Sequence, residues 1–188
     1  HPRVRRQRQM CIRDRYNDTF VNSGFYKHFS SNKYPKKRLA IITCMDTRLV
    51  ELLPAALGVH SGDVKLIKTA GSVIINPYDS TIRSLLIAIL EFGVEEVMVI
   101  GHTDCLSATI SSETLITHLV QRGIERDTIQ KLKEEGFDLD SWLQGMDSIK
   151  TAVKQSVTLI KDHPLIPNNV IIQGFIMDIS CGRLSPVL

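Results

Sequence analysis

The sequence lacks the features that mark membrane, secreted and dithiol-redox proteins. Its apolar runs fall well short of the roughly 18 residues that a membrane-spanning helix needs, and no apolar segment follows the basic N-terminal stretch as it would in a secretory signal. The four cysteines include no Cys-x-x-Cys pair, and in 188 residues they do not suggest a disulfide framework. We therefore expect a cytoplasmic protein that does not bind a membrane.

Excess positive charge is missing outside the first 15 residues. Residues 1–15 contain six arginines and one acidic residue, whereas residues 16–188 carry 17 basic and 19 acidic side chains. A slightly acidic body gives little electrostatic support to a nucleic-acid partner. We interpret residues 1–15 as a non-native or disordered basic head and residues 16–188 as one domain, long enough to bury a sizeable core.

The sequence has no internal repeat and no low-complexity tract, and its apolar segments alternate between strand and helix patterns. Short apolar runs at 39–42, 64–67 and 97–100 predict buried strands, and residues 79–92 have the wide apolar face of a helix. A strand, helix, strand order predicts parallel pairing with right-handed crossovers, so we expect an α/β fold. Residues 106–145 are more polar and predict short surface helices.

Three local patterns predict breaks or leave alternatives open. Pro54 interrupts a helical period, which predicts a short turn and then a fresh helix that ends at Gly58. Gly174 divides the last apolar stretch, which is either one closing strand or a pair. Residues 16–30 predict an amphipathic helix with an aromatic stripe that packs either on its own domain or on a second subunit, and the stripe comprises Tyr16, Phe20, Phe25 and Phe29.

No Gly-x-Gly-x-x-Gly turn follows the first predicted strand, which argues against a nucleotide-binding Rossmann-like protein. The strand is followed instead by the pattern Cys-x-Asp-x-Arg, and the strand at 97–100 is followed by Gly-His-x-x-Cys. Ligand sites in open α/β sheets gather at the carboxyl ends of neighbouring strands. We therefore expect Cys44, His102 and Cys105 to meet in a zinc site.

This set of ligands indicates a catalytic rather than a structural zinc site. Two thiolates and one imidazole leave one tetrahedral position open. Taken singly, each residue has an ordinary interpretation: a cysteine after a strand is usually a small buried apolar residue, and an Asp-x-Arg pair is usually a surface ion pair. The joint occurrence of these residues at two strand ends is what supports the metal hypothesis.

Cys-x-Asp-x-Arg followed after about sixty residues by Gly-His-x-x-Cys resembles the signature of the β-class carbonic anhydrases. Stretches such as Lys33-Tyr34-Pro35, Lys68-Thr69-Ala70-Gly71 and His163-Pro164-Leu165 are similar to the short bacterial branch of that family. The resemblance implies a mostly parallel sheet of about four parallel strands plus a C-terminal edge strand, flanked by helices. It also implies zinc-dependent interconversion of CO2 and bicarbonate by a homodimer or a tetramer.

By the same resemblance, residues of this sequence take specific roles in the site. One Zn²⁺ per subunit is held by Cys44, His102 and Cys105. Asp46 and Arg48 form a catalytic dyad, and Asp46 becomes a fourth metal ligand in a closed state that we expect at lower pH. The residues expected to line the substrate cleft are Ala70, Gly71 and Leu106.

Leu106 departs from the family pattern, in which glycine usually follows the second cysteine. An isobutyl group there predicts a narrower cleft or a shifted loop. Two alternatives to CO2 hydration therefore remain open. One is a non-catalytic zinc-binding relative whose cleft Leu106 has blocked, and the other is a hydrolase of a related small molecule such as CS2 or COS.

Overall fold

A computed structural model describes residues 16–187 of this chain, which form two compact units, the first ending at Lys33 and the second beginning at Tyr34. We describe each unit by itself. The interpretation of residues 1–15 as a basic head lies outside the described residues. A single domain over residues 16–188 stays a prediction.

The first unit contains the aromatic segment, which is not one helix. The α-helix α2 (Asp18–Asn22) ends before Gly24, and a 3₁₀ helix, η2 (Phe25–Phe29), follows it. The helix breaks because Gly24 takes a left-handed conformation, with φ of 70°. The Phe20 ring lies 6.0 Å from each of the rings of Phe25 and Phe29. No residue of α2 or η2 is buried, so this aromatic cluster is open to solvent.

The second unit is built on a five-stranded sheet with the strand order β2-β1-β3-β4-β5. The first four strands in this order are parallel, and β5 is antiparallel to β4 at the edge. This arrangement confirms the predicted fold class. The strands are β1 (Leu39–Cys44), β2 (Val64–Thr69), β3 (Glu96–His102), β4 (Ile171–Met177) and β5 (Leu184–Pro186).

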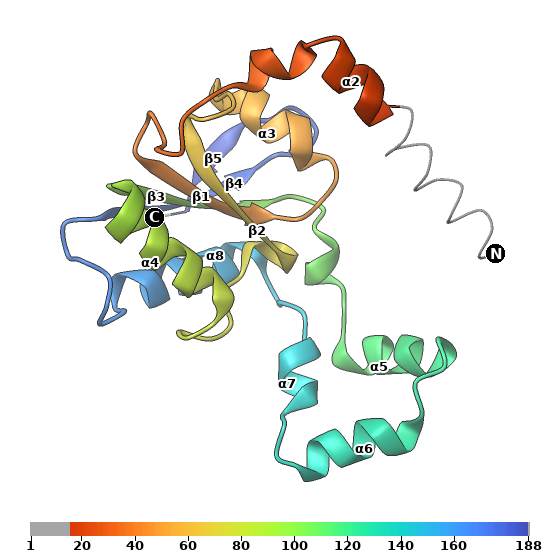
Figure 1. The fold of residues 1–188 in the computed structure, drawn as a ribbon. Helices are drawn as coiled ribbons and strands as arrows, with labels where there is room; N and C mark the ends of the chain where they lie inside the picture. Colours follow the sequence, from red (N-terminus) through yellow and green to blue (C-terminus); the bar gives the residue numbers. More distant parts are fainter. Residues whose placement is uncertain (1–15, 188) are drawn as a thin grey trace. The chain divides into compact units, whose positions relative to one another are not determined.

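Helices cover both faces of the sheet (Figure 1). α4 (Ser80–Phe92) and α8 (Ile149–Lys161) pack on one face over the larger core, and α3 (Leu49–Leu57) packs on the other face over a smaller core. Successive strand side chains point to opposite faces. Ile42 accordingly belongs to the larger core and Ile41 to the smaller one.

The order of the strands places a site between β1 and β3. The chain passes from β1 to β2 through α3 on one face, and returns from β2 to β3 through α4 on the other face. Right-handed crossovers in opposite directions require helices on opposite faces. The carboxyl ends of β1 and β3 therefore flank the point where the winding reverses, which is where ligands bind in open α/β sheets.

Three short α-helices lie between β3 and α8, as the polar composition of this region predicts. α5 (Ser112–Gln121), α6 (Arg126–Glu134) and α7 (Leu139–Leu143) form an arm that leads away from the sheet (Figure 1). The base of the arm is closed by a hydrogen bond from the Met146 amide to the Ser107 carbonyl oxygen, at 2.9 Å. The arm thus begins and ends beside the loop that follows Cys105.

The prediction that Pro54 separates a turn from a fresh helix is wrong. α3 is continuous over Leu49–Leu57 with Pro54 inside it, and it ends at Gly58 as expected. Proline removes one backbone donor, so the helix lacks the bond that this residue would have donated to the Val50 carbonyl. That bond lies in a short, partly exposed helix, and the amide of Val59 closes the end by donating to the Pro54 carbonyl at 3.0 Å. Packing of Leu49 and Leu53 in the smaller core outweighs the missing bond.

Gly174 does not interrupt its strand, because β4 runs unbroken from Ile171 to Met177. Its role is close packing. A Cβ atom at Gly174 would lie 2.8 Å from Cγ1 of Val153 and 3.1 Å from Cγ2 of Val157, both on α8. Glycine thus lets α8 approach the strand.

Gly174→Ala is expected to lower the free energy of unfolding by about 1–3 kcal/mol, the usual cost of overpacking a core. Val153→Ala removes the nearer methyl group, so the double variant is expected to lose less stability than the two single changes together. Urea unfolding measures both effects, and Gln173→Ala at the exposed neighbouring position is the control. Additive losses would contradict the assigned contact.

Candidate metal centre

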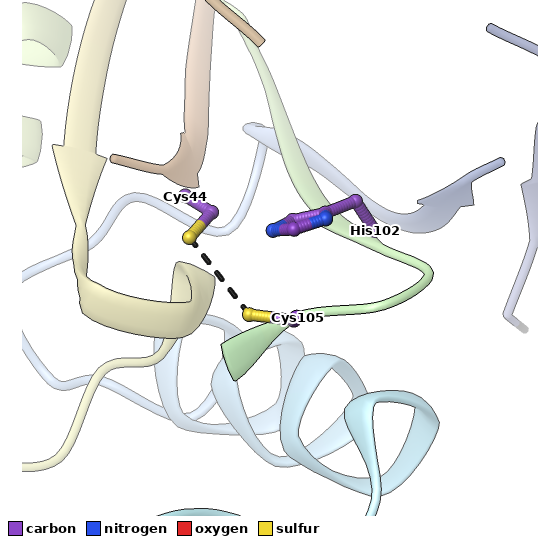
Figure 2. Close-up of side chains that lie close together, drawn as sticks. All are labelled: Cys44, His102 and Cys105. Carbon is purple, nitrogen blue, oxygen red and sulfur yellow. Dashed lines mark hydrogen bonds between the residues drawn. The ribbon is translucent and has the colours of Figure 1, made fainter. Parts of the chain in front are cut away.

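Three side chains of the types that bind zinc meet at the carboxyl ends of β1 and β3. The sulfurs of Cys44 and Cys105 are 3.9 Å apart, and these two atoms and a ring nitrogen of His102 all lie within 4.8 Å of one another. Figure 2 shows the two sulfurs and the imidazole ring turned toward a common space. All three residues are buried. The structure therefore brings together the three residues that the sequence predicted.

The geometry of this group fits a tetrahedral zinc ion. With zinc–sulfur bonds of about 2.3 Å at tetrahedral angles, two sulfur ligands lie about 3.8 Å apart, close to the separation in this chain. His102 Nδ1 is 2.8 Å from the carbonyl oxygen of Thr103 and is therefore the protonated nitrogen. The lone pair of His102 Nε2 is left for a ligand, and this atom is buried without a hydrogen-bond partner among the described residues.

The two thiols also favour a cation. Burial raises the pKa of the Cys105 thiol, and the neighbouring Cys44 sulfur raises it further. Two buried thiolates without a counter-charge would repel each other. A divalent cation between them removes this penalty, because it favours the deprotonated form of each ligand. The charges of the two thiolates and the types of the three ligand atoms therefore both favour a divalent cation such as Zn²⁺.

Hydrogen bonds to adjacent segments fix the carboxyl ends of β1 and β3. The Thr43 hydroxyl donates to the carbonyl oxygen of Ile100 at 3.0 Å and ties β1 to β3 just before the site. On the other side of the site, the amide of Thr103 donates to Met177 on β4, and the Thr103 hydroxyl accepts from the amide of Ile179. Both ligand-bearing segments are thus fixed by hydrogen bonds to adjacent strands or to the turn after β4.

Asp46 and Arg48 form the ion pair that the sequence predicted. Arg48 Nε donates to Asp46 Oδ1 at 3.0 Å, and Arg48 Nη2 donates to Asp46 Oδ2 at 2.8 Å. These hydrogen bonds are the main reason that the pKa of Asp46 is lowered to about 2. The carboxylate is therefore ionised at neutral pH, and its Oδ2 atom lies 3.9 Å from His102 Nε2, beside the three candidate metal ligands.

Sequence reasoning missed Asp104 as part of this arrangement. Its carboxylate accepts a hydrogen bond from Arg48 Nη1 at 2.7 Å, so Arg48 lies between two acidic side chains. Asp104 stands between the predicted ligands His102 and Cys105. Its contact with Arg48 is made from a left-handed backbone conformation, which the residue pattern does not predict.

The three residues predicted to line the cleft are in different surroundings. Ala70 lines a cavity of about 490 Å³ whose walls also include Ser107, Trp142 and Met146. Gly71 is buried, has a left-handed φ of 77°, and leaves no room for a Cβ atom beside Met146 and Ser107. Leu106 is 70% exposed and is not among the residues that line this cavity.

Within the described part of the chain, no helix has both the length and the apolar character needed to cross a membrane.

Comparisons with known proteins agree with this geometry. Residues 39–184 match the family model described as carbonic anhydrase. A putative carbonic anhydrase of Bacillus subtilis, YtiB, is 43% identical over 173 residues, which cover 92% of each chain. A carbon disulfide hydrolase of Acidithiobacillus thiooxidans is 30% identical over 158 residues, covering 80% of this chain and 77% of that protein. The crystal structure of a β-carbonic anhydrase from Trichomonas vaginalis superimposes with a TM-score of 0.81 at 32% identity, covering 92% of this chain and 96% of that one.

Proposed function

The chain belongs to the β-carbonic anhydrase family, and on that premise we propose that it catalyses the reversible hydration of CO2 to bicarbonate and a proton. One Zn²⁺ per subunit would be held by Cys44, His102 and Cys105. The observation that carries the proposal is the convergence of these three buried ligand atoms within 4.8 Å of one another at two strand ends. Family membership supports an enzyme over a non-catalytic zinc-binding module.

Zn²⁺ bound by these three residues would act as a Lewis acid and would lower the pKa of a coordinated water to about 7. Asp46 and Arg48 would orient the reacting groups beside the three ligands. The ionised Asp46 carboxylate can only accept hydrogen bonds. A water or hydroxyl group lying between Asp46 and the three ligands would therefore donate its proton to Asp46, and its lone pairs would point away from Asp46. Arg48 keeps the carboxylate ionised and in one orientation through two parallel hydrogen bonds.

Zinc-loaded protein tests this function directly. Stopped-flow measurement of CO2 hydration, with zinc content determined on the same preparation, is expected to show a rate above that of the buffer alone. A preparation that contains one zinc per chain and gives no rate above buffer would overturn the proposal.

We also propose that the chain forms a homodimer or a tetramer, for which the exposed aromatic cluster of the first unit offers an apolar surface. The mass of the particle in solution tests this proposal.

The closed state, in which Asp46 becomes a fourth ligand, is a further part of the proposal. In the structure the Asp46 carboxylate accepts hydrogen bonds from Arg48 Nε and Nη2. Closure needs Arg48 to release it. Cobalt-substituted protein is expected to change its visible absorption between about pH 6 and about pH 9, the range that brackets titration of a metal-coordinated water. An unchanged spectrum would count against closure.

Hydrolysis of CS2 or COS is the second candidate, favoured by the similarity to a carbon disulfide hydrolase. These molecules and CO2 are small linear electrophiles that one site geometry can present to the same nucleophile. Parallel assays of CO2 hydration and of sulfide release from CS2 decide between them. Sulfide release with no CO2 hydration by zinc-loaded protein would replace the first candidate by the second.

Leu106→Gly tests whether the leucine obstructs the site. Because the side chain is exposed, its removal is expected to change the CO2 hydration rate by no more than about twofold, the effect of an ordinary surface substitution. Leu106→Ala separates loss of the side chain from the added backbone freedom of glycine. A gain of about tenfold or more in both variants would show that Leu106 blocks the cleft.

A further inference from the structure

The Arg48 side chain binds two carboxylates. It donates to Asp46 from Nε and Nη2, at 3.0 Å and 2.8 Å. It also donates to Asp104, from Nη1 to Oδ2 at 2.7 Å and from Nη2 to the backbone carbonyl oxygen at 2.9 Å. Both edges of the planar guanidinium are therefore occupied, and its rotation is restricted from two sides.

The two carboxylates come from different strand ends. Asp46 follows β1, whereas Asp104 follows β3 and lies between the ligands His102 and Cys105. Arg48 thus links the two segments that carry the metal ligands. The link depends on the backbone at Asp104, whose φ of 53° is left-handed and uncommon for a residue other than glycine. Aspartate tolerates this conformation better than most residues do.

We propose that Asp104 is a positioning residue for the reaction proposed above: it fixes the plane of the Arg48 guanidinium, so that Nε and Nη2 face Asp46. This inference rests on the proposed function. Asp46 can orient a hydrogen-bond donor that lies between it and the three metal ligands only while Arg48 holds the Asp46 carboxylate in one rotamer. Without the Asp104 carboxylate, Nη1 loses this partner and the guanidinium can turn away from Asp46.

Loss of the Asp104 carboxylate is expected to change the free energy of unfolding only slightly. The Asp104 side chain is 80% exposed, and exposed ion pairs contribute little to the free energy of unfolding. A loss of turnover without a loss of stability or of zinc therefore distinguishes positioning from a structural role. Misplacement of a catalytic group by about 1 Å can cost as much as about 100-fold in rate.

Asp104→Gly is the sharpest variant, because glycine keeps the left-handed backbone while removing the carboxylate. In zinc-loaded protein we expect kcat for CO2 hydration to fall about tenfold, with KM changed less than about twofold and zinc content unchanged. Asp104→Asn keeps an acceptor oxygen and tolerates the same backbone, so it is expected to retain at least about a third of the rate. Asp140→Ala is the matched control, since Asp140 is an exposed partner of Lys133 far along the chain.

A second readout does not depend on turnover. Nitrogen-15 NMR of the Arg48 Nε–H group in the zinc-loaded chain reports how firmly that proton is held by Asp46. We expect its exchange with water to be at least about fivefold faster in Asp104→Gly and unchanged in Asp140→Ala. Wild-type exchange and wild-type kcat in Asp104→Gly would overturn the inference. Absence of CO2 hydration in the zinc-loaded wild type would overturn the proposed function instead, and the exchange rates would still report on the position of Arg48.

Discussion

Cys44→Ser is expected to abolish zinc binding and CO2 hydration together. The Cys44 sulfur is one of three buried ligand atoms, and it lies 3.9 Å from the Cys105 sulfur. A serine hydroxyl is shorter, is not ionised at neutral pH, and is a poor zinc ligand, so two protein ligands would remain. We expect the affinity for zinc to fall by at least about 100-fold and the hydration rate to fall to that of buffer.

Cys181→Ser is the matched control for that variant. Cys181 is a free, exposed cysteine on the turn between β4 and β5. The same chemical change there is expected to leave zinc content and the hydration rate unaltered. Because a serine at position 44 is also buried, circular dichroism is needed to show that the variant is folded. Folded Cys44→Ser protein that kept one zinc per chain would contradict the assignment of this ligand.

Asp46→Asn is expected to lower the hydration rate by about 100-fold to 1,000-fold while zinc stays bound, the range typical of removing one positioned hydrogen-bonding group from an active site. An amide can present its NH2 group where the carboxylate accepted a hydrogen bond, and it attracts Arg48 less strongly. Zinc analysis and stopped-flow kinetics on the same sample check this outcome. Asp138→Asn is the control, since hydrogen bonds from Ser141 also lower the pKa of Asp138, at the start of α7.

The pH dependence of the site follows from the direction of the Asp46 shift. Hydrogen bonds from Arg48 lower the pKa of Asp46 to about 2, below its ordinary value of about 3.9. The folded chain therefore favours the ionised form of Asp46. The resulting contribution to stability is fully present at pH values above the ordinary pKa, and it is lost as the pH falls toward 2. Any loss of activity between pH 5 and pH 8 must therefore begin with the titration of a group other than the Asp46 carboxyl, as the range of about 5–8 lies above both pKa values.

The sequence was sufficient to predict the parallel sheet and the convergence of the three candidate metal ligands. The apolar runs of β1 and β3 and the apolar face of α4 are local signals, and α4 is capped by Asp79 at its start and by Gly93 at its end. Strand order then decides which strand ends are neighbours. Because ligand types followed both β1 and β3, general rules for α/β sheets were enough to bring them together.

Other features depend on contacts that residue patterns do not reveal. The close fit of Gly71 against Met146 joins the segment after β2 to the base of the helical arm, about 75 residues further along the chain. Pro54 was predicted to break α3, but tertiary packing outweighed one missing hydrogen bond. The Leu106 side chain is 70% exposed, and the expectation that it narrows the cleft stays a prediction. Long-range packing decided the first two of these features.

X-ray absorption at the zinc K edge of the wild-type protein tests the central claim most directly. For two cysteine ligands and one histidine ligand, the spectrum should show two sulfur neighbours at about 2.3 Å and two nitrogen or oxygen neighbours at about 2.0–2.2 Å. The nitrogen shell should include the multiple-scattering signal of one imidazole ring. A zinc site with only oxygen and nitrogen neighbours, or with four sulfur neighbours, would contradict coordination by Cys44, His102 and Cys105.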